Sequence, residues 1–140
     1  MNESLRAASS MRDDIDQVFE QLHAMPEGPF AEMKTAGFIA ARLEDAGFEV
    51  RTGLAGTGVV ADLGPRQEVG TGQGTSPRDL APANPRDLRT PSGPTVLALR
   101  ADMDAMLHSV GGKEVYVHSC GHDAHSTMVL AAGIILARQC

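Results

Sequence analysis

The sequence has few of the residues that nucleic-acid-binding surfaces use. It contains no tryptophan and one tyrosine, and 18 acidic residues against 12 lysines and arginines give a formal net charge of −6. Such surfaces combine basic side chains that neutralise phosphates with aromatic side chains that stack on bases. We therefore expect no nucleic-acid partner.

Cysteines and long apolar runs are also scarce. Two cysteines, Cys120 and Cys140, are too few for a disulfide framework, which fits a reducing compartment. No uninterrupted apolar run reaches the roughly 18 residues of a membrane span. Residues 1–6 lack the apolar centre of a signal peptide. We expect a cytoplasmic chain with no membrane partner.

The residues that are present fit one domain, and several segments have helical periodicity. A hydrophobic fraction of 42% over 140 residues is enough for a packed core. Apolar residues recur at helical spacing over residues 11–25 and 33–46, and Gly47 stands where a left-handed C-cap belongs. A third apolar helical pattern covers residues 128–136.

Three segments between these helices predict strands. Residues 48–51 and 57–63 are short candidates, and the nearly all-apolar residues 95–99 predict a strand buried on both faces. The glycine-rich residues 53–58 lie between two predicted strands and no helix follows them, so a tight turn is favoured over a phosphate-binding loop. Helices, then strands, then a terminal helix predict an α/β layer structure.

Residues 64–94 differ in composition from the rest of the predicted domain, which covers residues 1–140. Pro, Gly, Arg, Ser and Asp dominate there, and apolar periodicity is lost. Residues 76–80 are nearly repeated by residues 84–88. A peptide-docking role is one interpretation, but a low-complexity, disordered insertion is favoured because the segment offers so few core residues.

The residues with the most chemical potential precede the last predicted helix. Cys120, His122 and Asp123 bring together a thiol, an imidazole and a carboxylate. If Cys120 and His122 lie on extended backbone, their spacing of two places both side chains on the same side, and Gly121 relieves crowding. Cys120 alone could be a small buried residue, and Asp123 could be a helix N-cap. Taken together, the residues favour a metal site.

A pair of acids follows the predicted buried strand. Asp102 and Asp104 would lie at its carboxyl end, where open α/β sheets bind ligands, so the two clusters could converge on one site. The plainer alternative is that both are ordinary acids at the end of a strand. His108 and His118 are expected at the surface or in loops.

Two stretches resemble a known family signature. Residues 99–105 (LRADMDA) and 117–125 (VHSCGHDAH) resemble the aminoacylase and carboxypeptidase superfamily, in the branch of hippurate hydrolases and auxin-conjugate hydrolases. The resemblance implies that residues 1–140 form the amino-terminal part of a three-layer α/β/α catalytic domain of a zinc-peptidase-like amidohydrolase. The remaining carboxyl-terminal strands and a dimerisation domain would follow residue 140.

The resemblance also implies roles for particular residues. Cys120 would be a thiolate ligand shared by two divalent ions, Zn or Mn, and His122 a second ligand. Asp104 would be an acid that orients a ligand, with Asp102 and His125 in the surroundings of the site. No catalytic residue is assigned, because the family's general-base glutamate is expected beyond residue 140.

The implied function is metal-dependent hydrolysis of the amide bond of N-acyl amino acids or related conjugates. The 140-residue chain alone is expected to be an incomplete, inactive fragment that binds metal weakly. It would form a homodimer or associate with a missing carboxyl-terminal half. The alternative is a noncatalytic remnant that binds a metal or a partner and associates with a full-length relative.

Overall fold

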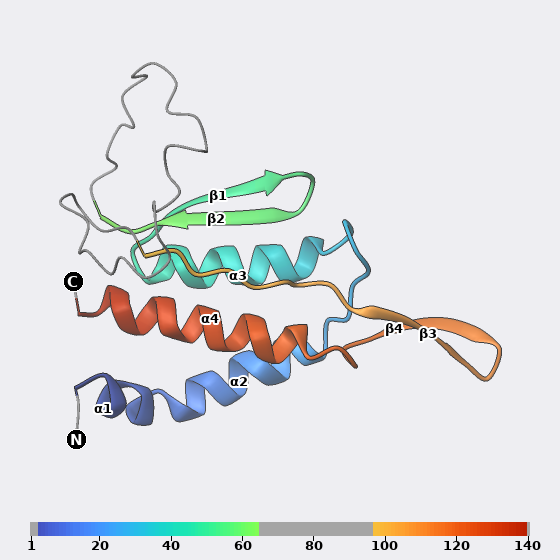
Figure 1. Ribbon diagram of the computed structural model, residues 1–140, viewed down its shortest axis with the longest axis horizontal. Helices are drawn as coiled ribbons and strands as arrows, with labels where there is room; N and C mark the ends of the chain where they lie inside the picture. The colour runs from blue at the N-terminus through green and yellow to red at the C-terminus, as the bar shows by residue number, and fades with distance from the viewer. Residues whose placement is uncertain (1–2, 65–96, 140) are drawn as a thin grey trace, which may run out of the picture. The chain divides into compact units, whose positions relative to one another are not determined.

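The computed structural model describes residues 3–64 and 97–139, shown in Figure 1. Of these, residues 3–64 and 99–139 belong to one compact unit. The predicted insertion, residues 64–94, lies outside the described residues except for Gly64.

The chain begins with two helices, α1 (Glu3–Ser10) and α2 (Arg12–His23). The amphipathic pattern predicted α2, whose Val18 and Leu22 are buried, but it did not predict α1. Acidic residues occupy the first turn of α2 and His23 occupies its last turn, which is the charge distribution that the helix dipole favours.

Helix α3 (Met33–Asp45) agrees with the predicted helix over 33–46. Its Ala36, Ile39 and Ala40 side chains are buried, and its end is a Schellman motif. Gly47 has a φ of 91°, the Gly47 N–H donates to Glu44 O, and the Phe48 N–H donates to Leu43 O. The predicted left-handed glycine is therefore confirmed.

Strands β1 (Glu49–Leu54) and β2 (Gly58–Asp62) follow as an antiparallel hairpin against α3. The tight turn predicted over 53–58 is confirmed, because residues 55–57 connect the two strands and Gly56 N–H donates to Gly53 O at 3.1 Å. The alternative of a phosphate-binding loop opening a helix is excluded at this position.

The predicted buried strand over residues 95–99 is wrong in the part that the structure describes. Residues 97–100 form no regular secondary structure, and Leu97 and Leu99 are 68% and 46% exposed. An apolar run becomes a buried strand only where neighbouring strands accept its backbone hydrogen bonds, and none of the described strands pairs with this one.

A second hairpin, β3 (Met106–Val110) and β4 (Lys113–Val117), was not predicted. Its two-residue connection is Gly111-Gly112, with φ values of 59° and 77°. Two-residue turns whose twist matches that of the flanking strands require a positive φ at both positions. The glycine pair was therefore the signal in the sequence for this hairpin.

The two hairpins form separate antiparallel sheets, not one shared sheet. The mixed α and β content agrees with the predicted class. The three-layer arrangement is not seen among the described elements and stays a prediction.

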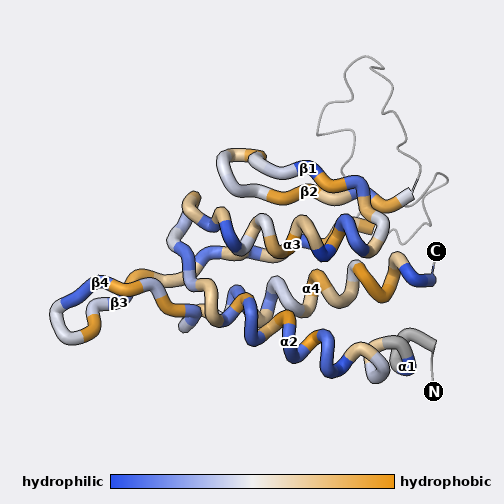
Figure 2. Tube along the Cα trace, turned by 180° about the vertical axis from the view of Figure 1, so that it is seen from behind, coloured by the Kyte–Doolittle hydropathy of each residue, from blue (hydrophilic) through white to orange (hydrophobic). Residues whose placement is uncertain are grey.

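Helix α4 (His122–Ala137) lies beside α2 and α3 and completes the core. Hydrophobic residues continue along its carboxyl-terminal half (Figure 2). The buried core cluster consists of Met11, Val18, Leu22, Ile39, Leu130 and Ile134. No helix among the described residues is long and apolar enough to cross a membrane.

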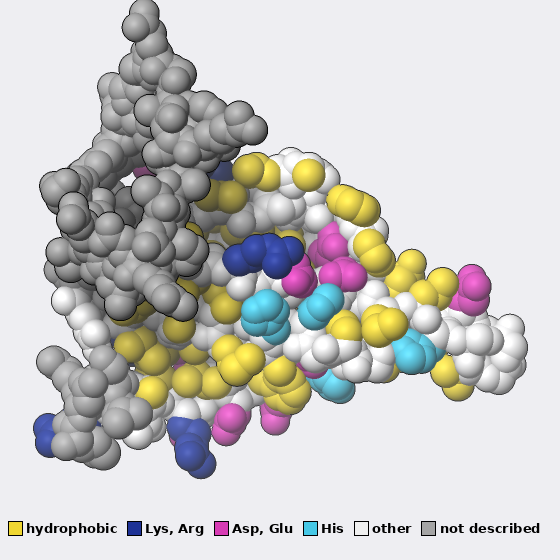
Figure 3. All heavy atoms as spheres, in the orientation of Figure 1, with side chains coloured by type: hydrophobic (Ala, Val, Ile, Leu, Met, Phe, Trp, Pro, Cys, Tyr) yellow, Lys and Arg dark blue, Asp and Glu magenta, His cyan; other side chains and the backbone are white. Residues whose placement is uncertain are grey.

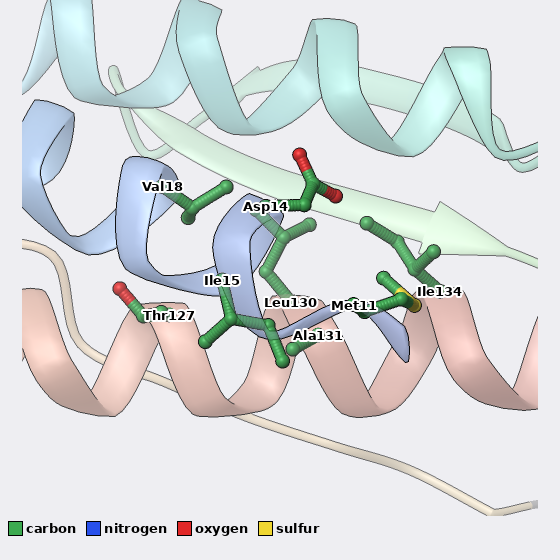
Figure 4. Close-up of a pocket in the computed structure, with 8 residues that line it drawn as sticks. All are labelled: Met11, Asp14, Ile15, Val18, Thr127, Leu130, Ala131 and Ile134. Atoms are coloured by element: carbon green, nitrogen blue, oxygen red, sulfur yellow. The ribbon is translucent and has the colours of Figure 1, made fainter. Parts of the chain in front are cut away.

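Side chains of α2 and α4 enclose a cavity of about 10 Å³, shown in Figure 4. Val18 and Ile15 line it from α2, and Leu130 and Ile134 line it from α4. A cavity this small holds at most one water molecule, so it is a packing gap between the helices and not a ligand site.

Candidate metal centre

The two chemically interesting segments of the sequence meet at the start of α4. Asp104 Oδ1 and the Asp104 carbonyl oxygen each lie 3.0 Å from His122 Nδ1. The Cys120 thiol donates to the same carbonyl oxygen, with Sγ at 3.6 Å. The two segments therefore converge as expected through Asp104, which contacts both predicted ligands, whereas the Asp102 carboxylate contacts Arg100.

These contacts determine which nitrogen of His122 is free. Both groups facing Nδ1 are hydrogen-bond acceptors, so Nδ1 must carry the proton and donate it to Asp104. The lone pair is then on Nε2. A histidine whose one nitrogen donates to a carboxylate or carbonyl while the other is unprotonated is the usual form of a metal-binding imidazole.

The backbone that presents the ligands differs from the prediction. Gly121 has a φ of 81° and is the N-cap of α4, and His122 is the first residue of that helix. Cys120 and His122 are therefore not on extended backbone. Gly121 supplies a left-handed turn that other residues adopt at a cost, so its function is conformational and not the relief of crowding.

Cys120 is exposed, which excludes the interpretation of it as a small buried residue. An exposed thiol beside an oriented imidazole is accessible to a metal ion.

Asp123 is not the N-cap of α4. It is the second residue of the helix, its side chain is only 3% exposed, and the N-cap residue makes no side-chain hydrogen bond. His23 Nδ1–H of α2 donates to Asp123 Oδ2 at 2.6 Å. Burial raises the pKa of Asp123, but hydrogen bonds from His23 and the Ala124 N–H, with the nearby His118, more than offset it, so this pKa lies below its ordinary value.

His118 lies in the loop after β4, as expected, but it is buried, with 7% of its surface exposed. Neither of its ring nitrogens has a hydrogen-bond partner within the described part of the chain. Its ring centroid lies 6.3 Å from that of His23. His108 is on β3, half-buried, and its Nε2 lies 2.6 Å from Ser119 Oγ.

Sequence reasoning missed Glu27, which organises the other side of this region. Its carboxylate accepts hydrogen bonds from the Lys34 and Thr35 N–H groups of the first turn of α3. Its carbonyl oxygen accepts a 2.7 Å hydrogen bond from the N–H of Ala105, the residue after Asp104. The one available signal was an acid placed shortly before a predicted helix, where carboxylates satisfy free N–H groups.

His23 was also missed as a member of the site region. Histidine in the last turn of an amphipathic helix is explained by the helix dipole alone, so nothing local in the sequence indicated a partner at residue 123. Figure 3 shows histidine and acidic side chains gathered on one face, next to hydrophobic side chains.

The donor types at this centre fit a metal ion, but the described donors are too few for a closed site. Thiolate and neutral imidazole are the ligands that Zn²⁺ prefers. Within residues 3–64 and 97–139, no group of three or more His, Cys, Asp or Glu side chains is arranged to hold a metal ion. Cys120 and the free Nε2 of His122 therefore amount to two donors, one fewer than a catalytic zinc site normally has.

Comparison with known proteins gives relatives along most of the chain. It is 31% identical over 136 residues to the hippurate hydrolase of Campylobacter jejuni, covering 92% of this chain and 29% of that protein. It is 33% identical to IAA-amino acid hydrolase ILR1-like 6 of Arabidopsis thaliana, covering 87% and 22%. The N-acetyl-L-cysteine deacetylase of Bacillus subtilis is 27% identical, covering 91% and 26%.

Over most of its length this chain is similar to amidohydrolases. The chain spans less than a third of the length of these three relatives. No family model matches it, and no solved structure matches it.

Proposed function

We propose that this chain carries part of the metal site of an enzyme that hydrolyses the amide bond of N-acyl amino acids or related conjugates. The observation that carries the proposal is the contact of Asp104 with both His122 and Cys120. Hippurate and N-acetyl-L-cysteine, the compounds in the names of two relatives, are both N-acyl amino acids. The similarity to these relatives supports the same substrate class here.

Each of the three residues has a distinct role in this proposal. Cys120 contributes a thiolate and His122 contributes Nε2. Asp104 accepts a hydrogen bond from the Nδ1–H group, which holds the imidazole plane in place and makes Nε2 a better electron donor. One or two divalent ions, Zn or Mn, would supply Lewis acidity towards the amide carbonyl and lower the pKa of a bound water.

We identify no general base among these 140 residues. Asp123 is the only acidic residue after His122 in the sequence, and its carboxylate is buried against His23. We therefore propose that the proton-transferring group is not part of this chain. Catalysis would require that group from elsewhere in the active protein.

We also propose that the described elements belong to a larger three-layer α/β/α domain. Helix α4 is apolar around most of its circumference, yet Met128 is 63% exposed and Leu136 is 37% exposed. A helix with apolar residues on all sides is normally covered on all sides. This supports a further layer against α4.

A noncatalytic role in binding a partner chain is the second candidate function. The β3–β4 hairpin exposes Met106, Leu107 and Val110, and as described it is an isolated two-stranded sheet. Such hairpins are only marginally stable in water, and their unpaired edges accept further strands. If this role holds, mixing the chain with a full-length relative should give a stable heteromeric complex by sedimentation.

The metal proposal is tested with Co²⁺, whose thiolate charge-transfer absorption reports directly on a bound cysteine. The Cys120→Ala chain should lose this absorption, because a methyl group cannot donate to the ion. Cys140→Ala is the matched control and should keep it. Equal losses from both variants would mean that the cysteine ligand has been assigned wrongly.

A further inference from the structure

The starting point is a hydrogen bond between residues 100 positions apart in the sequence. His23, in the last turn of α2, donates from Nδ1 to the Asp123 carboxylate at 2.6 Å. Asp123 is almost fully buried, while the His23 side chain is 57% exposed. A short hydrogen bond to a buried carboxylate is among the stronger polar contacts in proteins.

The position of this bond relates it to the predicted ligands. Asp123 directly follows His122, and both belong to the first turn of α4. That turn has no side-chain cap, and it begins at a glycine with a left-handed backbone. A rotation of the first turn would move His122 and Asp123 together, so the bond to His23 also restrains His122.

A second set of contacts holds the same turn to another segment. Ser126 Oγ donates to the Asp102 carbonyl oxygen at 2.8 Å, and His122 Nδ1 donates to Asp104. These bonds attach α4 to the segment that carries Asp102 and Asp104. The bond from His23 is a polar contact that attaches the first turn of α4 to α2.

His118 forms a cluster with His23 and Asp123 near the predicted ligands. It is buried beside His23, with ring centroids 6.3 Å apart, and it stands two residues before Cys120. In this cluster of His23, His118 and Asp123, Asp123 is adjacent in sequence to the predicted ligand His122. His118 is close in sequence to the other predicted ligand, Cys120. Phe19, one turn before His23 on α2, packs on the His23 ring at 5.6 Å.

We propose that His23 is a positioning residue that, through Asp123, holds the Cys120–His122 ligand pair in its metal-binding geometry. This inference rests on the proposed metal role of Cys120 and His122. Among the described residues, His23 does not join Cys120 and His122 in a group arranged to hold a metal ion, so it is not counted as a ligand. Its effect is to hold Cys120 and His122 in the metal-binding geometry before the ion binds.

Three variants separate this role from a general loss of stability. His23→Ala removes the hydrogen bond. His23→Asn is the conservative variant, since its side-chain N–H can occupy the place of Nδ1–H. Arg42→Ala is the matched control, because it removes a different ion pair of α2, the 2.8 Å contact with Asp14, at a distance in the sequence from the ligands.

The first measurement is Co²⁺ affinity by titration of the thiolate charge-transfer absorption. Loss of contacts that orient metal ligands typically weakens metal binding by about 10- to 100-fold. His23→Ala should show a loss in this range, His23→Asn should recover most of the affinity, and Arg42→Ala should bind as the unchanged chain does.

The second measurement is hydrogen exchange in the metal-free chain, which does not depend on the proposed function. His23→Ala should speed amide exchange at the start of α4, including His125, whose N–H donates to Gly121 O, more than Arg42→Ala does. Unchanged exchange there would overturn the inference. Co²⁺ binding that survives Cys120→Ala would instead overturn the proposed metal site, and faster exchange in His23→Ala would then still support the restraint on α4.

Discussion

Asp104 is the residue on which the proposed metal site depends most directly. It offers two acceptors to His122 Nδ1, one from its side chain and one from its backbone. The backbone acceptor remains after any substitution, whereas the carboxylate is lost. The side chain therefore adds charge and rigidity to an orientation that the backbone already favours.

We expect Asp104→Ala to weaken metal binding by about 10- to 100-fold, the range found when a contact behind a metal ligand is removed. Asp102→Ala is the matched control. The Asp102 carboxylate contacts Arg100, and its contact with α4 is made by the backbone carbonyl. Isothermal titration with Zn²⁺ measures both variants, and equal affinities for the two would contradict the role of Asp104.

Gly121 and Gly37 allow a direct test of backbone conformation. Gly121 has a φ of 81° at the start of α4, whereas Gly37 is exposed within α3 and a Cβ there meets no atom within 4 Å. Gly121→Ala should destabilise the chain by about 1–2 kcal/mol. Gly37→Ala should stabilise it by about 0.5–1 kcal/mol. Thermal unfolding measures the stability of both variants. Stability changes of the same sign would contradict the assignment of a left-handed backbone to Gly121 and a helical one to Gly37.

The amino-terminal end of α3 takes its hydrogen-bond acceptors from a side chain outside the helix. Its N-cap residue, Glu32, makes no capping bond, and Glu27 supplies the acceptors for Lys34 and Thr35 from five residues before that position. The same residue holds Ala105 through its carbonyl. Helix α3 and the segment after Asp104 are thus joined at one point.

Glu27→Ala should destabilise the chain by about 0.5–2 kcal/mol, the usual effect of losing a cap. Burial raises the pKa of Glu27, but the bonds from Thr35 and Lys34 outweigh it and place this pKa below its ordinary value. The stability that its carboxylate contributes is therefore complete above the ordinary glutamate pKa and is lost as pH falls through the lower, folded-state pKa.

Urea unfolding of the unchanged and Glu27→Ala chains as a function of pH checks this expectation. The difference in unfolding free energy should be largest near neutral pH and should shrink in acid. A difference that grows as pH falls would have the wrong sign and would reject the capping role.

For the whole chain, the main consequence concerns activity. We expect a polypeptide of these 140 residues to release no amino acid from hippurate at a measurable rate, even with Zn²⁺ or Mn²⁺ supplied. Two donors hold an ion weakly, and loss of a general base alone typically costs about 10² to 10⁴ in rate. Chelator-sensitive turnover by the purified chain would contradict this expectation, and Asp104→Asn and Asp123→Asn would then be tested for the base.

Local sequence patterns were sufficient for several elements of this protein. Helical periodicity gave α2 and α3 to within a few residues, and Gly47 was correctly placed at the end of α3. The turn between β1 and β2 followed from its glycines. The apolar pattern over residues 128–136 lies within α4. These features depend on residues that are neighbours along the chain.

Other features depended on which distant segments pack together. An apolar run predicted a strand at 95–99, but a strand needs a neighbour, and the described part of that run has none. Asp104 meets His122 across 18 positions, and His23 meets Asp123 across 100. The contact of His23 with Asp123 forms because helix packing in the core brings α2 and α4 together, and that of Asp104 with His122 forms because the segment before β3 lies against the start of α4. No local pattern encodes which polar groups then come within hydrogen-bonding distance.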